Sequence, residues 1–151
     1  MSNFIQSQEL IFEHLIPTDE QITILYELLK LRSHTISHFG NPTFAEHSDF
    51  VRKNPYRAWY LLRLKDTYVG TIYVTVENTL GINILDPYLE YCLQPVVDKT
   101  MSELDPLPEM RSVRAGYFSI NVPFSNKVMA AKLEAMGFMA SQTTYKKYSA
   151  V

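Results

Sequence analysis

Three neighbouring strand patterns between residues 57 and 85 constrain the fold more than any other part of the sequence. The runs RAWYLLRLK and YVGTIYVTVE are rich in aromatic and β-branched residues, and they flank Asp66 and Thr67 as the arms of a hairpin would. In the second run, apolar residues alternate with Thr71, Tyr73 and Thr75. A third run, LGINIL, follows the turn-forming sequence ENT. We therefore predict three consecutive antiparallel strands at the centre of the fold.

Helical patterns and further strands surround this central sheet. Residues 9–16 predict a strand, and Thr18 and Thr43 each begin a helix through a capping box with Gln21 or Glu46. This order of elements predicts an α+β fold, a mixed, mostly antiparallel sheet of about six to seven strands flanked by about four helices. We expect one domain over residues 1–151. The other predicted elements are a helix from Pro95, a strand over residues 111–122, a helix capped by Ser125 and ended by Gly137, and a strand or strand pair within residues 138–150.

Composition narrows the class of protein. The chain has 151 residues, 46% of them hydrophobic and 20% charged, which is enough for one buried core. Its net charge of -2 offers no basic patch for nucleic acid. The lone Cys92 excludes an internal disulfide and suits a reducing compartment. The N-terminus does not resemble a signal peptide, and no window approaches the roughly 18 apolar residues of a membrane span, so we expect a cytoplasmic protein without nucleic-acid or membrane partners.

Two long phrases carry a resemblance to a known family. They are AEHSDFVRKNPYRAWYLLRLKDTYVGTIYVTVENTLGINI at residues 45–84 and INVPFSNKVMAAKLEAMGFMASQTTYKKY at residues 120–148. The first resembles the central part of sugar-nucleotide and small-amine members of the GCN5-related N-acetyltransferases (the GNAT superfamily). The second is similar to the family's asparagine after the fifth strand, its following helix, its Gly-Phe pair and its closing strand. With the preceding elements, the resemblance covers roughly residues 9–148.

The resemblance implies a binding mode for acetyl-CoA or another acyl-CoA as co-substrate. In this family the fourth and fifth strands are parallel and part around the acyl-CoA, and the pyrophosphate lies on the following loop and helix start. Here the fourth strand would be Gly81–Leu85, the loop Glu90–Gln94, and the helix would begin near Pro95. The implied acyl-CoA-binding residues are Ile84, Leu85, Tyr91, Cys92, Leu93, Gln94, Val96, Asn121, Phe124 and Asn126.

Two departures from the family pattern leave a second interpretation open. The predicted loop, LEYCLQ, lacks the family's glycines, and Glu90 places a carboxylate where a pyrophosphate would lie. Leu133 stands where many members have the tyrosine that protonates the departing thiolate. The leading interpretation is an N-acyltransferase acting on an amine of a small molecule. The alternative interpretations are a GNAT-like binding module that has lost CoA and catalysis, and an unrelated α+β domain.

The resemblance also assigns roles in catalysis and in acceptor binding. Glu77 and Tyr73 are candidates to handle the proton of the attacking amine, and Asn83 could order a water molecule. Each of the three could equally be an ordinary surface or strand-edge residue. We expect no metal, because the histidines at 34 and 38 have no third ligand nearby. The resemblance also implies a homodimer, paired through a sheet edge or through the last strands. The candidates for the acceptor pocket are His34, His38, His47 and Trp59, of which His47 and Trp59 also suit a core position.

Overall fold

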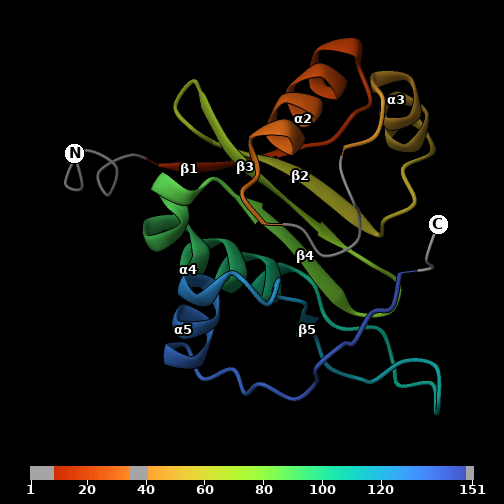
Figure 1. The fold of residues 1–151 in the computed structure, drawn as a ribbon, viewed down its shortest axis with the longest axis vertical. Coiled ribbons are helices and arrows are strands. Elements are labelled where there is room, and N and C mark those ends of the chain that lie inside the picture. Colours follow the sequence, from red (N-terminus) through yellow and green to blue (C-terminus); the bar gives the residue numbers. More distant parts are fainter. Residues whose placement is uncertain (1–8, 35–40, 149–151) are drawn as a thin grey trace.

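An antiparallel meander of four strands forms the centre of the molecule (Figure 1). The computed structural model describes residues 9–34 and 41–148. The sheet order is β1-β2-β3-β4-β5, and only the β4–β5 pair is parallel. The prediction of three consecutive antiparallel strands is confirmed by β2, β3 and β4. The strands are β1 (Leu10–His14), β2 (Ala58–Leu64), β3 (Thr67–Val74), β4 (Thr79–Ile84) and β5 (Ser119–Ile120).

Helices cover both faces of this sheet (Figure 1). Helices α2 (Asp19–Leu31) and α3 (Phe44–Lys53) pack on one face, where their apolar side chains bury Trp59 and Leu61. Helices α4 (Asp86–Glu103) and α5 (Lys127–Ala135) pack on the other face, over side chains of β2, β3 and β4. Because neighbouring residues of a strand point to opposite faces, β2 and β3 contribute side chains to both cores. We call these faces the α2/α3 face and the α4/α5 face.

Local capping explains where the first two helices begin. The Thr18 hydroxyl accepts from the backbone N–H of Gln21, as predicted, but the Gln21 side chain accepts from Ile16 and not from Thr18. Thr43 and Glu46 form the complete capping box that the sequence predicts. Each helix therefore begins where the sequence places it.

Helix α4 corrects the predicted loop and helix start. Its helical turns begin at Asp86 and continue through Pro95 to the end of the element, so residues 90–94 are helix and not loop. The proline that begins the helix is Pro87, which needs no N–H in the first turn. Pro95 lies in the interior, where its missing N–H removes one hydrogen bond of the helix. The predicted pyrophosphate loop at Glu90–Gln94 is therefore wrong.

The C-terminal third also contains less strand than predicted. Within the expected strand at residues 111–122, only β5 pairs with the sheet, and the earlier part makes a turn closed by Met110 and Arg114. Residues 139–148 form no strand and are exposed, including Met139 at 88% and Tyr145 at 92%. The predicted last strand is wrong: these residues pair with no described strand, and their exposed side chains gain no burial that would stabilise one. The last helix begins one residue later than expected, since Asn126 caps it in place of Ser125, and Gly137 ends it with a φ of 96°.

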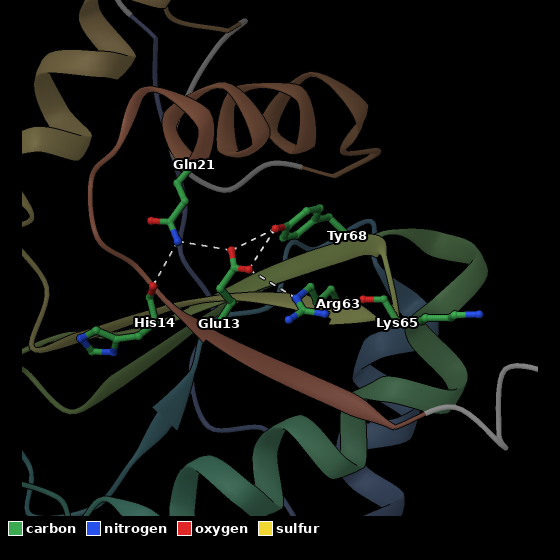
Figure 2. Close-up of polar contacts among 6 residues, drawn as sticks. All are labelled: Glu13, His14, Gln21, Arg63, Lys65 and Tyr68. Atoms are coloured by element: carbon green, nitrogen blue, oxygen red, sulfur yellow. Dashed lines mark hydrogen bonds and ion pairs between the residues drawn. The ribbon is translucent and has the colours of Figure 1, made fainter.

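A polar cluster ties α2 to the sheet at the β1 side of the α2/α3 face (Figure 2). The Glu13 carboxylate accepts from the Tyr68 hydroxyl at 3.0 and 3.1 Å, from Arg63 Nε at 3.3 Å and from Gln21 Nε2 at 3.3 Å. Gln21 also donates to the carbonyl of His14. We call Glu13, Gln21, Arg63 and Tyr68 the Glu13 cluster. Because the side chains of Gln21, Arg63 and Tyr68 all donate to the Glu13 carboxylate, the cluster stabilises the fold and is not a candidate binding site.

Candidate active site

The parting of β4 from β5 creates the most distinctive backbone feature of the fold. The two strands pair at Thr79–Ser119 and Leu80–Ile120, after which no described strand pairs with β4 on that side. The Leu85 N–H donates to the Val69 carbonyl at 2.9 Å. Because hydrogen bonding alternates along an antiparallel strand, the residues of β4 that bond to β3 are the odd-numbered ones. By alternation, Ile82 and Ile84 direct their backbone N–H and C=O groups away from β3, beyond the last β5 pair. This strand edge can accept an extended polar ligand as a further strand would.

The start of α4, directly after this edge, is a poor site for an anion. Leu85 is the N-cap and supplies no side-chain cap, and Pro87 has no N–H to offer. Asp86 adds a carboxylate in the first turn, where it already accepts from the Ser33 hydroxyl at 2.8 Å. The helix dipole favours an anion at this end, but the Asp86 charge opposes it.

The residues implied as acyl-CoA-binding fall into three different environments. Ile84 and Leu85 lie at the end of β4, beside the parting, and Ile84 is buried. On α4, the side chains of Cys92, Leu93 and Val96 are buried in the core, and burial raises the pKa of the Cys92 thiol. Their contact with a ligand is therefore blocked by the sheet. The others are partly or fully exposed: Tyr91 and Gln94 on α4, and Asn121, Phe124 and the capping Asn126 before α5.

The end of α2 lies between the two elements that flank the parting. Ser33 contacts Asp86 at the start of α4, and His34 Nδ1 lies 2.6 Å from Ser125 Oγ just before α5. The predicted acceptor residue His34 is thus at the mouth of the site. His38 lies outside the described residues. Sequence reasoning missed Ser33 and Ser125, because nothing in their local pattern signals a contact between residues so far apart.

An aromatic cluster lies on the α2/α3 face where the parting begins. The rings of Tyr56 and Tyr73 stack with centroids 3.9 Å apart and an interplanar angle of 9°. Tyr73 pairs across the strands with Gly81, and its ring occupies the space that a side chain at Gly81 would fill. Burial, together with the neighbouring Tyr73 hydroxyl, raises the pKa of Tyr56. The Tyr73 side chain is thus placed over β4, one residue after its last β5 pair.

Arg32 adds a cation to this aromatic pair. It caps the C-terminal end of α2 and is partly buried. Burial lowers the pKa of its guanidinium, and the Tyr73 phenol nearby opposes that shift. In the described part of the chain, no carboxylate forms an ion pair or hydrogen bond with it. We call Arg32, Tyr56 and Tyr73 the Arg32 cluster. Sequence reasoning missed Arg32, since a basic residue ending a helix needs no functional explanation.

The other predicted site residues lie at varying distances from this cluster. Asn83 is partly buried on the same strand face as Tyr73, and its side chain hydrogen-bonds to no described residue. Glu77 is exposed in the turn between β3 and β4, before the point where β4 and β5 pair. The Trp59 ring is buried and donates to Thr71 Oγ1 at 3.0 Å, which satisfies its only polar group.

His47 occupies a buried position on α3. Its ring lies against Tyr26 with centroids 5.2 Å apart, and its Nε2 has no hydrogen-bond partner within the described ranges. Burial lowers the pKa of this imidazole, offset in part by the Ile22 carbonyl. Trp59 and His47 thus lie in the core, which is the second of the two positions that the sequence allowed for them.

Solved structures of acetyltransferases share this fold. An acetyltransferase from Thermus thermophilus aligns with a TM-score of 0.63 and 19% identity, over 86% of each chain. The aminoglycoside N-acetyltransferase AAC(6′)-Iy, in complex with the bisubstrate analogue CoA-S-monomethyl-acetylneamine, aligns with 0.59 and 8%, over 95% of this chain and 99% of that one. The spermidine/spermine N-acetyltransferase SpeG from Vibrio cholerae aligns with 0.58 and 11%, over 86% and 79%. No family profile and no curated protein matches the sequence.

The structural matches confirm the fold expected from the sequence resemblance. The chain has the α+β fold of the GCN5-related N-acetyltransferases, and its described residues form five strands in place of the six to seven expected. Within residues 9–34 and 41–148, no group of three potential metal ligands occurs. None of the described helices is both long and apolar enough to cross a membrane.

Proposed function

We propose that this protein is an N-acyltransferase of the GNAT superfamily that moves an acyl group from an acyl-CoA to an amine of a small molecule. The observation that carries the proposal is the parting of β4 and β5 after Leu80, within a fold shared with acetyltransferases. The cytoplasmic location and the homodimer stay predictions.

The free edge of β4 suits the amide-rich pantetheine arm of an acyl-CoA. The backbone groups of Ile82 and Ile84 would pair with the two amides of that arm, as they would with a neighbouring strand. Beyond Ile84, the pyrophosphate would meet the start of α4, where Asp86 and Pro87 weaken anion binding. We therefore expect the strand edge, and not the helix terminus, to supply most of the affinity.

Tyr73 is our candidate for moving the proton during transfer. The amine nitrogen bonds to the thioester carbonyl carbon, the carbon–sulfur bond breaks, and one proton must pass from nitrogen to sulfur. A neutral phenol can accept that proton while giving its own to the sulfur. Tyr73 lies over Gly81 at the start of the parting, and α5 offers no hydroxyl at Leu133, which is buried in the core. Asn83, on the same face, is the candidate to order a water, whereas Glu77 in its exposed turn takes no part in the proposal.

Calorimetric titration with acetyl-CoA, free CoA and a longer acyl-CoA tests the proposal. We expect saturable binding tighter than about 100 μM, which corresponds to about 5.5 kcal/mol. Ile82→Pro removes a backbone N–H directed into the parting without removing a β3 bond, so it should weaken binding at least tenfold. Ile82→Val is the matched control, because it trims the side chain and keeps the N–H. Equal affinity in both variants would argue against the strand edge as the binding site.

A second candidate function follows from the first turn of α4. The carboxylate of Asp86 and the missing N–H of Pro87 also suit a GNAT-like module that has lost CoA binding and binds another partner. Absence of heat on titration with all three CoA compounds, by protein that melts cooperatively, would favour this candidate and refute the acyltransferase.

A further inference from the structure

Helix α3 is attached to the rest of the fold through a buried histidine. Two of its ten residues are buried, His47 and Val51, and the His47 side chain is only 9% exposed. The imidazole ring lies against Tyr26 of α2, with centroids 5.2 Å apart. One of the two residues that bury α3 is therefore ionisable at mildly acidic pH, and the docking of α3 on α2 must accommodate its charge state.

The surroundings of His47 suit the neutral ring and not the charged one. Its Nε2 atom is buried and has no hydrogen-bond partner among the described residues. In the neutral ring this nitrogen is an acceptor left without a donor, whereas protonation makes both ring nitrogens N–H donors and adds a positive charge. A buried charge without a partner is far more costly than a buried neutral group.

The ionisable groups on the two helices around this contact are bonded to partners other than His47. These groups form the ion pairs Glu27–Lys30, Asp19–Arg52 and Asp49–Lys53, Glu46 accepts from the Thr43 backbone, Tyr26 donates to the Pro42 carbonyl, and Glu20 is exposed. Lys30 also lies over the Tyr26 ring, 5.1 Å from its centroid, so the nearest of these charges is itself positive. Within the described residues, a protonated His47 thus finds no counter-ion.

Helix α3 can leave α2 as a unit, because its own residues satisfy its two ends. The capping box of Thr43 and Glu46 closes the first turn, and the N–H of Asn54, in the left-handed conformation, donates to the Val51 carbonyl. Phe50 is the contact of α3 with the aromatic side chains of the sheet. Its ring is 44% exposed and lies 5.9 Å from that of Tyr56 between centroids.

We propose that His47 is a pH-sensitive switch that keeps α3 docked on α2 while the imidazole is neutral and releases the helix when it is protonated. Release would withdraw Phe50 from Tyr56, whose ring stacks on Tyr73 at 3.9 Å. The Tyr73 ring, next to the strand edge assigned to the pantetheine arm, would then lose its support. This consequence rests on the proposed acyltransferase function, whereas the switch itself does not.

The direction of the pH effect follows from burial. Burial lowers the pKa of His47 in the docked state, while an exposed imidazole keeps the ordinary value of about 6.5. The undocked state therefore binds the proton more tightly, so docking is strongest above about pH 6.5 and weakens as pH falls below it. Between pH 7.5 and 5.5 we expect the population of the undocked state to rise about tenfold.

Hydrogen exchange measured by mass spectrometry on the whole protein tests the switch. Protection factors at pH 7.5 and 5.5 are compared, since they correct for the pH dependence of exchange itself. The α3 amides should lose about tenfold in protection at the lower pH, and the α4 amides should keep theirs. Unchanged protection of α3 would overturn the inference. Equal losses in both helices would also do so, because acid would then unfold the domain as a whole.

Two substitutions remove the titration in different ways. His47→Gln keeps a polar side chain, and His47→Phe keeps a ring against Tyr26 without the unpaired nitrogen. In both, α3 should have the same protection at the two pH values. His14→Gln, at an exposed histidine that ends β1, is the matched control and should retain the full loss. Wild-type behaviour in both His47 variants would assign the titration to another group. If neither variant folds, the comparison of α3 with α4 in the wild-type protein decides.

Calorimetry with acetyl-CoA tests the consequence for the proposed site. The loss of affinity between pH 7.5 and 5.5 should be smaller in His47→Gln than in the wild-type protein, because titration of the CoA phosphates is common to both. Equal losses, with α3 released in the exchange experiment, would leave the switch in place and refute its influence on the site. If neither protein binds acetyl-CoA at pH 7.5, the acyltransferase proposal fails, and hydrogen exchange still decides the switch.

Discussion

The Glu13 cluster and the Arg32 cluster use similar side chains on the same face of the sheet, yet they differ in one component. Each contains an arginine and a tyrosine beside an end of α2. In the first, Glu13 joins Arg63, Tyr68 and Gln21 (Figure 2), whereas the second has no carboxylate among the described residues. The difference teaches that such donors stabilise the fold where the acceptor is built in, and that they contribute less to stability where the described residues supply no acceptor.

Removing the Glu13 carboxylate, the acceptor of the Glu13 cluster, should have the largest effect on stability. Glu13→Ala leaves Arg63, Tyr68 and Gln21 without their acceptor, and we expect a loss of about 2 kcal/mol in the free energy of unfolding. The estimate is modest because the side chains of Glu13 and Arg63 are 26% and 29% exposed. Urea denaturation monitored by circular dichroism measures it.

Arg32→Gln is the substitution in the Arg32 cluster that corresponds to Glu13→Ala in the Glu13 cluster. Because this cation lacks a partner in the described chain and its burial opposes its charge, its removal should change stability by less than about 0.5 kcal/mol. Equal losses in Glu13→Ala and Arg32→Gln would mean that Arg32 already has a structural partner. In that case the two clusters would not differ in the way described.

A side chain at Gly81 should disturb the Arg32 cluster and leave the Glu13 cluster unchanged. Gly81→Ala puts a Cβ into the space of the Tyr73 ring, which must leave its stack on Tyr56. Since Tyr73 is partly exposed and can move outward, we expect a cost of about 1 kcal/mol. Near-ultraviolet circular dichroism reports the change through Trp59, the single tryptophan, whose ring centroid lies 6.3 Å from that of Tyr73.

Gly137→Ala is the control that separates the clash with the Tyr73 ring from the backbone strain of replacing a glycine at positive φ. Gly137 has a φ of 96°, but a Cβ there meets no atom within 4 Å. The substitution should therefore cost about 1 kcal/mol through backbone strain and leave the tryptophan signal unchanged. The same spectrum in both variants would contradict the placement of Tyr73 over Gly81.

The sequence predicted those elements whose signals are local. Thr43 and Glu46 form their capping box within one turn, and the alternation in β3 needs only neighbouring residues. The start of α4 was mispredicted, although its buried residues follow a helical spacing that begins at Leu89, before Pro95. Two prolines offered two possible first turns, and the expected family loop favoured the later one. Periodicity over the whole segment would have favoured Pro87.

The candidate site was harder to predict because its partners meet only in the folded chain. Alternation along β3 singled out Tyr73, but nothing in the local pattern indicates that its ring covers Gly81. Asn78 is another such residue: it is fully buried in the β3–β4 turn and bonds to the backbone of Leu107 and Ala115. Arg32 becomes informative only because no described carboxylate lies against it, and an absence of contacts has no sequence pattern.

The smallest expected effect concerns the tyrosines of the two clusters at alkaline pH. Burial and Glu13 raise the pKa of Tyr68, and burial and Tyr73 raise that of Tyr56. In each case the folded state holds the proton more tightly than the unfolded state. The associated stability is therefore present below the unfolded value of about 10 and is lost as pH rises through the folded pKa.

Urea midpoints at pH 8, 9.5 and 10.5 measure this loss. Tyr56→Phe and Tyr68→Phe should each flatten the decline above about pH 10, and Tyr56→Phe should do so more, because its pKa is raised further. Tyr145→Phe, at an exposed position, should follow the wild-type curve. In a Glu13→Gln background the loss of the carboxylate charge should reduce the effect of Tyr68→Phe and leave that of Tyr56→Phe unchanged. A change in both would show that the two clusters are coupled through the sheet and are not the independent sites that their contacts indicate.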